Sequence, residues 1–372
     1  MSGPKTDLEA PAARFERACG RFFIRVILIL APIILVDFAS RYFWSHRRSK
    51  IERRFPVEVV RHPKPYVMFG GIGGGALPDG ERLNELGYRG KAPSAEKAAG
   101  EYRIFMLGGS TVFSGEPPIA VLLERFLRED GREGVSVYNF GVVSSVSGME
   151  LARILYEVVD LSPDMVVVYN GSNDIMLPLT HDPRPGNPFN FIVYENNPLL
   201  ESDIRSYPAL SLLLYGSNLA RYFVSSYFME RFIPLDEVRA EVGWGSDSWR
   251  EAIADAYVGR MVKAKKLCEG FGVRFIGFMQ PLVYFKDRPA PEEQTEHFRP
   301  QRKAHAVVVR RLIRDKIALL PAEDRVAVID LTDVFDETAE QVFTDHTHTN
   351  QEGKEIVASA MCRHIIGQFE LE

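Results

Sequence analysis

Short apolar runs alternate with stretches of helical periodicity from about residue 100 to the C-terminus. Runs of this kind, rich in β-branched and aromatic residues, are typical of parallel strands that are buried on both faces. The predicted strands are Tyr102–Leu107, Val135–Phe140, Met165–Asn170, Val273–Phe278 and Val326–Asp330. The predicted helices between them are Pro118–Glu129, Gly148–Val159, Ser248–Leu267 and Lys303–Leu320. This alternation predicts a three-layer α/β/α sandwich around a mostly parallel five-stranded sheet.

A different pattern precedes this region. Phe22–Trp44 is almost wholly apolar and is long enough to cross a bilayer as a helix, although Asp37 interrupts it. The residues that follow are aromatic and basic, whereas a cleaved signal peptide ends in small residues. The sequence therefore favours an uncleaved transmembrane anchor. The alternative is a buried or interfacial helix of a soluble protein.

The two ends of this anchor differ in charge. Three arginines precede it, whereas six basic residues follow its uncharged run, Val26–Val36: Arg41, Arg47, Arg48, Lys50, Arg53 and Arg54. Because basic residues prefer the cytoplasmic side, this count alone would place the large C-terminal part in the cytoplasm.

These patterns divide the chain into consecutive parts. Residues 45–100 are rich in Pro and Gly, which is typical of a stalk or of surface loops. A long aromatic, Pro-punctuated stretch at about 177–245 predicts an insertion that forms a lid or substrate wall, or else a structural subdomain. The predicted parts are an N-terminal tail (1–21), the anchor (22–44), stalk and lead-in loops (45–100) and an α/β domain with that insertion (101–372).

Composition limits the classes of partner. The 45 Lys and Arg residues against 50 Asp and Glu residues give a net charge of −5 over 372 residues, which excludes the basic surface that nucleic acids require. The three cysteines, Cys19, Cys268 and Cys362, show no CxxC spacing. We therefore expect no nucleic-acid partner, no structural zinc site and no disulfide framework. The sequence does not indicate an oligomeric state.

Polar residues with catalytic potential follow the first three predicted strands. The first strand leads into LGGSTVFSG, where Ser110 follows two glycines at a turn that would expose its hydroxyl. The second leads into NFG, where the amide of Gly141 could point into the same crevice. The third leads into NGSND, which supplies Asn173 and Asp174. Singly, each motif is also explained by a turn or a helix cap.

A fourth block near the C-terminus, FTDHTHTN, contains an aspartate and two histidines. Asp345 precedes His348 by three residues, so its carboxylate can orient that imidazole while the other ring nitrogen faces Ser110. His346 is the competing base. The spacing favours His348, because a loop aspartate reaches back over two residues more easily than onto its neighbour.

Together, the four blocks resemble those of the SGNH hydrolase family, the GDSL-type esterases and lipases. The resemblance covers about residues 66–369 and implies Ser110 as nucleophile, Gly141 and Asn173 as oxyanion donors, and Asp345 and His348 as the rest of a catalytic triad. Two departures are Gly109 in place of the aspartate of the GDS form and Ser114 in place of a common glycine. The family also implies a flavodoxin-like fold without a metal or other cofactor.

The resemblance implies a membrane-anchored serine esterase that removes small acyl groups, above all acetyl, from an ester substrate such as an acylated polysaccharide. It also implies a periplasmic catalytic domain on a bacterial inner membrane, which conflicts with the count of basic residues. Two alternatives stay open. One is an O-acyltransferase of envelope polysaccharide that uses the same triad, and the other is a non-catalytic glycan-binding scaffold.

Overall fold

The computed structural model describes residues 9–47, 57–196, 217, 219, 233–294 and 299–368. The chain forms two compact units, which are described separately. The larger unit comprises Ile51–Ile192 and Pro234–Glu372, and the smaller comprises Met1–Lys50 and Val193–Ile233.

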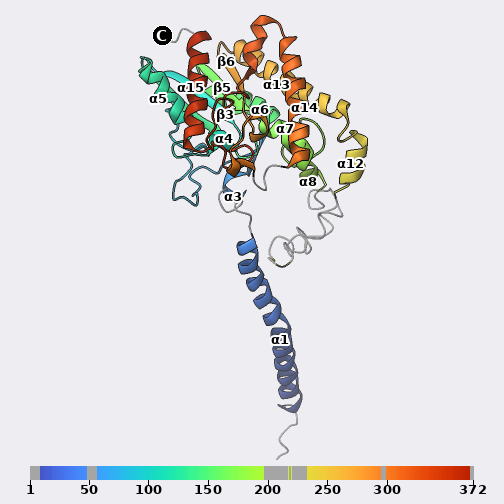
Figure 1. The fold of residues 1–372 in the computed structure, drawn as a ribbon. Coiled ribbons are helices and arrows are strands. Elements are labelled where there is room, and N and C mark those ends of the chain that lie inside the picture. Colours follow the sequence, from blue (N-terminus) through green and yellow to red (C-terminus); the bar gives the residue numbers. More distant parts are fainter. Residues whose placement is uncertain are drawn as a thin grey trace, which may run out of the picture. The chain divides into compact units, whose positions relative to one another are not determined.

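A parallel sheet lies at the centre of the larger unit (Figure 1). Its strands are β3 (Tyr102–Gly108), β4 (Val135–Gly141), β5 (Met165–Asn170), β6 (Arg274–Met279) and β7 (Ile329–Asp330). Their order across the sheet is β4-β3-β5-β6-β7, and each neighbouring pair is parallel. The predicted fold class is confirmed, because this is the doubly wound, flavodoxin-like strand order. Ligands of such sheets bind beyond the carboxyl ends of the strands where the order reverses, here between β3 and β5.

Helices cover both faces of the sheet. α5 packs against α15 on one face, and α13 packs against α6 and α14 on the other (Figure 1). The helices of this unit after β3 are α4 (Ser110–Phe113), α5 (Ile119–Glu129), α6 (Ser147–Arg153), α7 (Ser172–Thr180), α12 (Leu235–Glu241), α13 (Asp247–Gly270), α14 (Pro300–Ala318) and α15 (Gln351–Gln368). The short helix α8 (Phe191–Glu195) begins at the end of the first segment of this unit.

Two elements differ from those predicted. The helix predicted for 148–159 ends as α6 at Arg153 and continues as a π-helix, Ile154–Val158, and a 3₁₀ turn, Val159–Leu161. The last strand is only two residues long, because a 3₁₀ helix occupies Ala322–Ala327. Within the apolar run that predicted this strand, Ala327 and Val328 are buried but lie outside it, so their apolar character reported burial rather than strand pairing.

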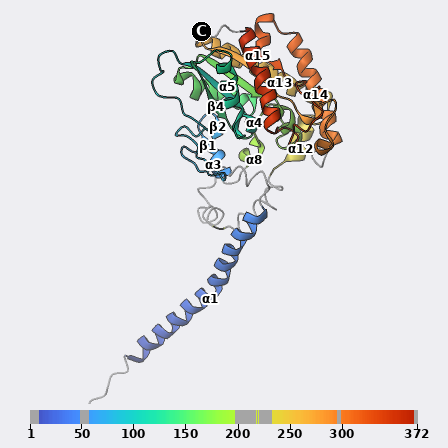
Figure 2. The ribbon, with the colours of Figure 1, turned by 60° about the vertical axis from the view of Figure 1, so that its left-hand side comes forward.

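The segment predicted as stalk and lead-in loops packs onto the larger unit over its described residues, 57–100. It forms α3 (Val57–Val60) and a small antiparallel ribbon of β1 (His62–Lys64) and β2 (Met68–Gly70) (Figure 2). The Tyr88 ring stacks on Phe140 of β4 with 3.9 Å between ring centroids, and the guanidinium of Arg153 donates to Phe69 O. The described residues 57–100 therefore belong to the same compact unit as the sheet.

The smaller unit contains the long helix α1 (Glu9–Arg47). Its stretch Phe15–Ser40 is long and apolar enough to cross a membrane, a property that signal sequences share. The Asp37 carboxylate accepts hydrogen bonds from the Ser217 hydroxyl at 2.5 Å and the Leu219 amide at 2.8 Å. The charge that interrupts the apolar run thus has partners within the same unit. Residues 197–216, 218 and 220–232 of the predicted insertion lie outside the described residues.

Candidate active site

Ser110 is the first residue of α4, and a single residue, Gly109, separates it from the end of β3. The two preceding glycines stand where a side chain would collide with the neighbouring segments. A Cβ on Gly108 would lie 2.2 Å from Tyr169 O, and one on Gly109 would lie 2.7 Å from Asn173 Nδ2. The glycines thus allow the turn that carries Ser110 to approach the end of β5, where the strand order reverses.

Three predicted side chains form one hydrogen-bonded chain. His348 Nε2 lies 2.8 Å from Ser110 Oγ, and His348 Nδ1 lies 2.7 Å from Asp345 Oδ2. The other carboxylate oxygen of Asp345 accepts from the amides of Thr347 and His348, each at 2.8 Å. Burial alone would raise the pKa of Asp345, but these hydrogen bonds outweigh burial and hold it well below its usual range. The ionised carboxylate can therefore fix the imidazole tautomer.

The loop that carries His348 is attached to the ends of two strands by Thr347. The Thr347 hydroxyl is hydrogen-bonded to Ser172 Oγ at 2.8 Å and accepts from Gln280 Nε2 at 3.0 Å. Ser172 follows β5 and Gln280 follows β6. The sequence analysis missed this positioning residue, because a threonine between two histidines carries no signal until its distant partners are known.

His346, the competing base, lies elsewhere. Its Nδ1 is 3.9 Å from Asp345 Oδ1, and its ring faces that of Tyr284 with 6.3 Å between centroids. Its carbonyl accepts a hydrogen bond from the Val283 amide. The structure therefore joins His348, and not His346, to Ser110.

Asn173 lies beside the same turn. Its Nδ2 donates to Ser145 O at 2.7 Å, and a carboxamide nitrogen carries a second hydrogen that this bond does not use. Asn173 is not the cap of α7, because the residue at that position is Gly171, with no side-chain capping bond. The carboxamide thus lies against Gly109 and is positioned by a backbone carbonyl.

The amide of Gly141, the other predicted donor, already has a hydrogen-bond acceptor. Gly141 ends β4, and its N–H donates to Asn139 Oδ1 at 2.9 Å. The turn beyond β4 lies closer to Asn173, because Ser145 supplies the carbonyl that Asn173 binds. Ser144 in this turn has a φ of 67°, which is uncommon for a residue other than glycine. Nothing in the sequence indicated this backbone conformation.

Two buried carboxyl groups lie behind Asn173. Asp174 accepts from the Ser147 hydroxyl at 2.5 Å and from the Ser147 amide, so it holds the first turn of α6. The carboxyl group of Glu150 is hydrogen-bonded to the side-chain amide of Asn170. Burial, reinforced by the charge of Asp174, raises the pKa of Glu150 to about 8. Both carboxyl groups are therefore held by hydrogen bonds inside the core.

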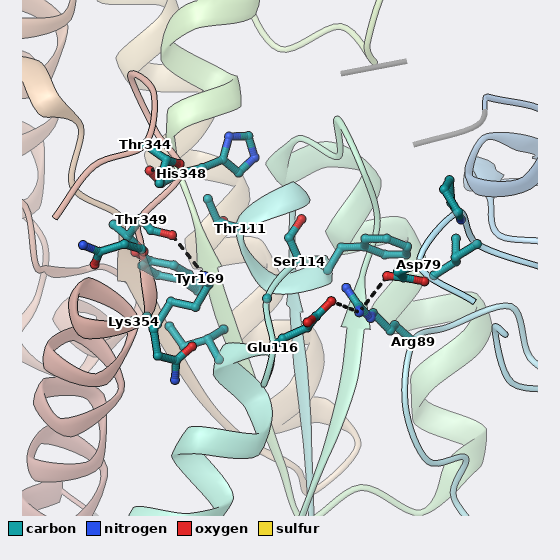
Figure 3. Close-up of a pocket in the computed structure, with 17 residues that line it drawn as sticks. Asp79, Arg89, Thr111, Ser114, Glu116, Tyr169, Thr344, His348, Thr349 and Lys354 are labelled. Carbon is teal, nitrogen blue, oxygen red and sulfur yellow. Dashed lines mark hydrogen bonds and ion pairs between the residues drawn. The ribbon is translucent and has the colours of Figure 1, made fainter. Parts of the chain in front are cut away.

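A pocket of about 610 Å³ opens beside His348 (Figure 3). It lies between α4, the turn before α5 and the start of α15, with Tyr169 of β5 in its lining. Neither Ser110 nor Asn173 lines it. Among the described residues, no three or more His, Cys, Asp or Glu side chains gather in a way that could hold a metal ion.

No protein-family model matches the chain, and no curated protein sequence matches it. The chain is similar to solved structures. A lipase/acylhydrolase from Enterococcus faecalis is 17% identical, with a TM-score of 0.40, over 73% of this chain and 98% of that one. An acetyl xylan esterase is 13% identical, with a TM-score of 0.39, over 71% and 99% of the two chains. A GDSL-like lipase from Bacteroides thetaiotaomicron is 14% identical, with a TM-score of 0.36, over 72% and 90%.

Replacement of Asn173 by Ala is expected to lower kcat by about 10²- to 10³-fold, or about 2.7–4 kcal/mol, with a small change in KM. The reason is that its amide would meet the substrate oxygen only when that oxygen carries tetrahedral charge. Steady-state kinetics of Asn173→Ala and of the near-isosteric Asn173→Asp, which lacks the N–H donor, check this. A variant that loses stability but keeps a normal kcat would instead show a structural role.

Proposed function

We propose that this protein is a serine esterase of the SGNH type. The observation that carries the proposal is the continuous hydrogen-bonded chain from Ser110 Oγ through the His348 imidazole to the Asp345 carboxylate, with bonds of 2.8 and 2.7 Å. A serine hydroxyl becomes a nucleophile when an adjacent base takes its proton and a third group orients that base. Asp345 is ionised at neutral pH, as this role requires.

In the proposed reaction, Ser110 Oγ attacks the ester carbonyl while its proton passes to His348 Nε2. The tetrahedral oxyanion accepts hydrogen bonds from the free N–H of Asn173 and from the backbone amide of Ser110. Collapse of the tetrahedral intermediate breaks the ester C–O bond, and His348 returns the proton to the departing alcohol. Water, activated by the same imidazole, then attacks the acyl-enzyme, releases the carboxylic acid and restores Ser110.

The proposed substrates are small acyl esters, above all acetyl, on carbohydrate. The resemblance of the four sequence blocks supports this choice, because anchored members of that family often act on envelope polysaccharides. Transfer of the acyl group to a sugar hydroxyl is the second candidate. It is supported by the pocket beside His348, which has room for an acceptor close to the base that would activate it.

Hydrolysis of a series of 4-nitrophenyl esters, from acetyl to long-chain acyl, by the full chain in detergent tests the proposal. We expect Ser110-dependent hydrolysis that is fastest for acetyl. Addition of a sugar acceptor separates the two reactions, because transfer forms an acyl sugar at the expense of free acid. A steady rise in kcat/KM with chain length would contradict the small acyl group, and absence of any hydrolysis would contradict the esterase.

The proposal includes a location. The apolar stretch Phe15–Ser40 would hold the protein in a bilayer, and a polysaccharide substrate would place the larger unit on the periplasmic side of a bacterial inner membrane. An export-dependent phosphatase fused after Glu372 is therefore expected to be active, and a reporter that fluoresces only in the cytoplasm is expected to be dark. The reverse result would favour the orientation that the basic residues indicate.

A further inference from the structure

We propose that Gln280 is a positioning residue of the esterase, because its side chain joins the turn of the nucleophile to the loop of the base. The proposal rests on the proposed function and adds a residue that acts through its neighbours. Gln280 directly follows β6, and its backbone N–H donates to Asn170 O at the end of β5 at 2.8 Å. Its backbone is therefore fixed at the carboxyl edge of the sheet, where the candidate site lies.

The two ends of the Gln280 carboxamide face different segments of the site. Its Nε2 donates to Thr347 Oγ1 at 3.0 Å, and its Oε1 accepts a longer hydrogen bond from Thr111 Oγ1 at 3.5 Å. Thr347 immediately precedes His348, and Thr111 immediately follows Ser110. One planar group thus spans the two segments that must keep His348 Nε2 within 2.8 Å of Ser110 Oγ.

The same network reaches the oxyanion side of the site. The Thr347 hydroxyl is also hydrogen-bonded to Ser172 Oγ at 2.8 Å, and Ser172 immediately precedes Asn173. Gln280 and Ser172 are each 3% exposed and Thr347 is 8% exposed, so their hydrogen bonds form away from water, where such bonds are stronger. The side chains of this positioning network are those of Thr111, Ser172, Gln280 and Thr347.

The loop that carries the base depends on supports from other segments. An isolated β-bridge joins Phe343 to Thr349, and residues 344–348 between them belong to no helix or strand. Catalytic groups must be held within about 0.5 Å of their productive positions, which a loop achieves only when rigid elements support it. Gln280 supplies such a support from the end of β6, a strand that is paired on both sides.

Gln280→Met tests the proposal in the full chain in detergent, because it keeps the length of the side chain and removes both polar ends. We expect kcat for 4-nitrophenyl acetate to fall about 10- to 100-fold with little change in KM, since small displacements of catalytic groups cost rate rather than binding. Labelling of Ser110 by a fluorophosphonate should slow in parallel. The matched control is Gln294→Met, at an exposed residue of the same segment whose side chain donates to Pro289 O, and it should change neither rate.

Thr347 provides a second test, which does not depend on the folding of Gln280→Met. Thr347→Ser keeps the hydroxyl and is expected to keep most of the activity. Thr347→Val keeps the shape, removes the hydroxyl and is expected to lower kcat at least as much as Gln280→Met. Because Gln280→Met and Thr347→Val break the same hydrogen bond, the double variant should lose less than the product of the two single factors.

A purely structural role of Gln280 predicts a different pattern. In that case Gln280→Met would have a lower melting temperature but normal kcat and labelling at a temperature where it is folded, and this result would overturn the proposal. Equal activity of Thr347→Ser and Thr347→Val, independent factors in the double variant, or an equal loss in Gln294→Met would also overturn it. All these results would leave the esterase intact. Hydrolysis that persists in Ser110→Ala would instead overturn the proposed function.

Discussion

Ser110→Ala is expected to lower kcat for 4-nitrophenyl acetate by about 10⁴- to 10⁶-fold, the range over which loss of a triad nucleophile acts. Without the hydroxyl that lies 2.8 Å from His348 Nε2, no acyl-enzyme can form, and the remaining groups can only bind the ester and stabilise its oxyanion. Steady-state rates and covalent labelling by a fluorophosphonate probe measure the loss. Ser248→Ala, whose hydroxyl contacts only Ser246 in the described structure, is the matched control and should label normally.

Labelling also locates the nucleophile independently of rate. The altered turn of this chain places a second serine, Ser114, four residues after Ser110, at the end of α4. If the probe still labelled Ser110→Ala, and the label were found on Ser114, the assignment of the nucleophile would have to move along the turn.

His348→Ala is expected to reduce kcat by a similar factor of about 10⁴ to 10⁶, whereas His346→Ala should retain most of the activity. The reason is geometric, because His348 bridges Ser110 and Asp345 with bonds of 2.8 and 2.7 Å. The His346 ring instead lies beside Tyr284. Parallel kinetics of the two single variants form a matched pair, since each removes an imidazole from the same loop. Loss of turnover in His346→Ala with activity retained in His348→Ala would exchange the two assignments.

The architecture of the sheet followed from local patterns. β5 coincides with the predicted Met165–Asn170, and β6 is displaced by one residue from the predicted 273–278. A strand that is buried on both faces must be apolar throughout, so its composition identifies it without knowledge of its neighbours. The same reasoning predicted a last strand that is longer than the observed one, because an apolar run indicates burial and not the hydrogen bonds that define a strand.

The relation between Asp345 and His348 was also local. The Asp345 carboxylate accepts the amides of Thr347 and His348 within one loop, so the three-residue spacing was enough to predict which imidazole it orients. The rest of the candidate site was predicted from the residues that follow each strand, because the carboxyl ends of parallel strands lie at one edge of the sheet.

Only the tertiary structure decided which groups face that edge. The N–H of Gly141, a predicted oxyanion donor, donates to the Asn139 side chain, whose own amide nitrogen donates to the distant Val112 O. Thr347 owes its role to Ser172 and Gln280, which follow other strands. The Ser114 hydroxyl is buried, and it has no hydrogen-bond partner among the described residues. Sequence determines residue type and local spacing. The direction of an N–H, and whether a side chain finds a hydrogen-bond partner in a distant segment, depend on how those segments pack.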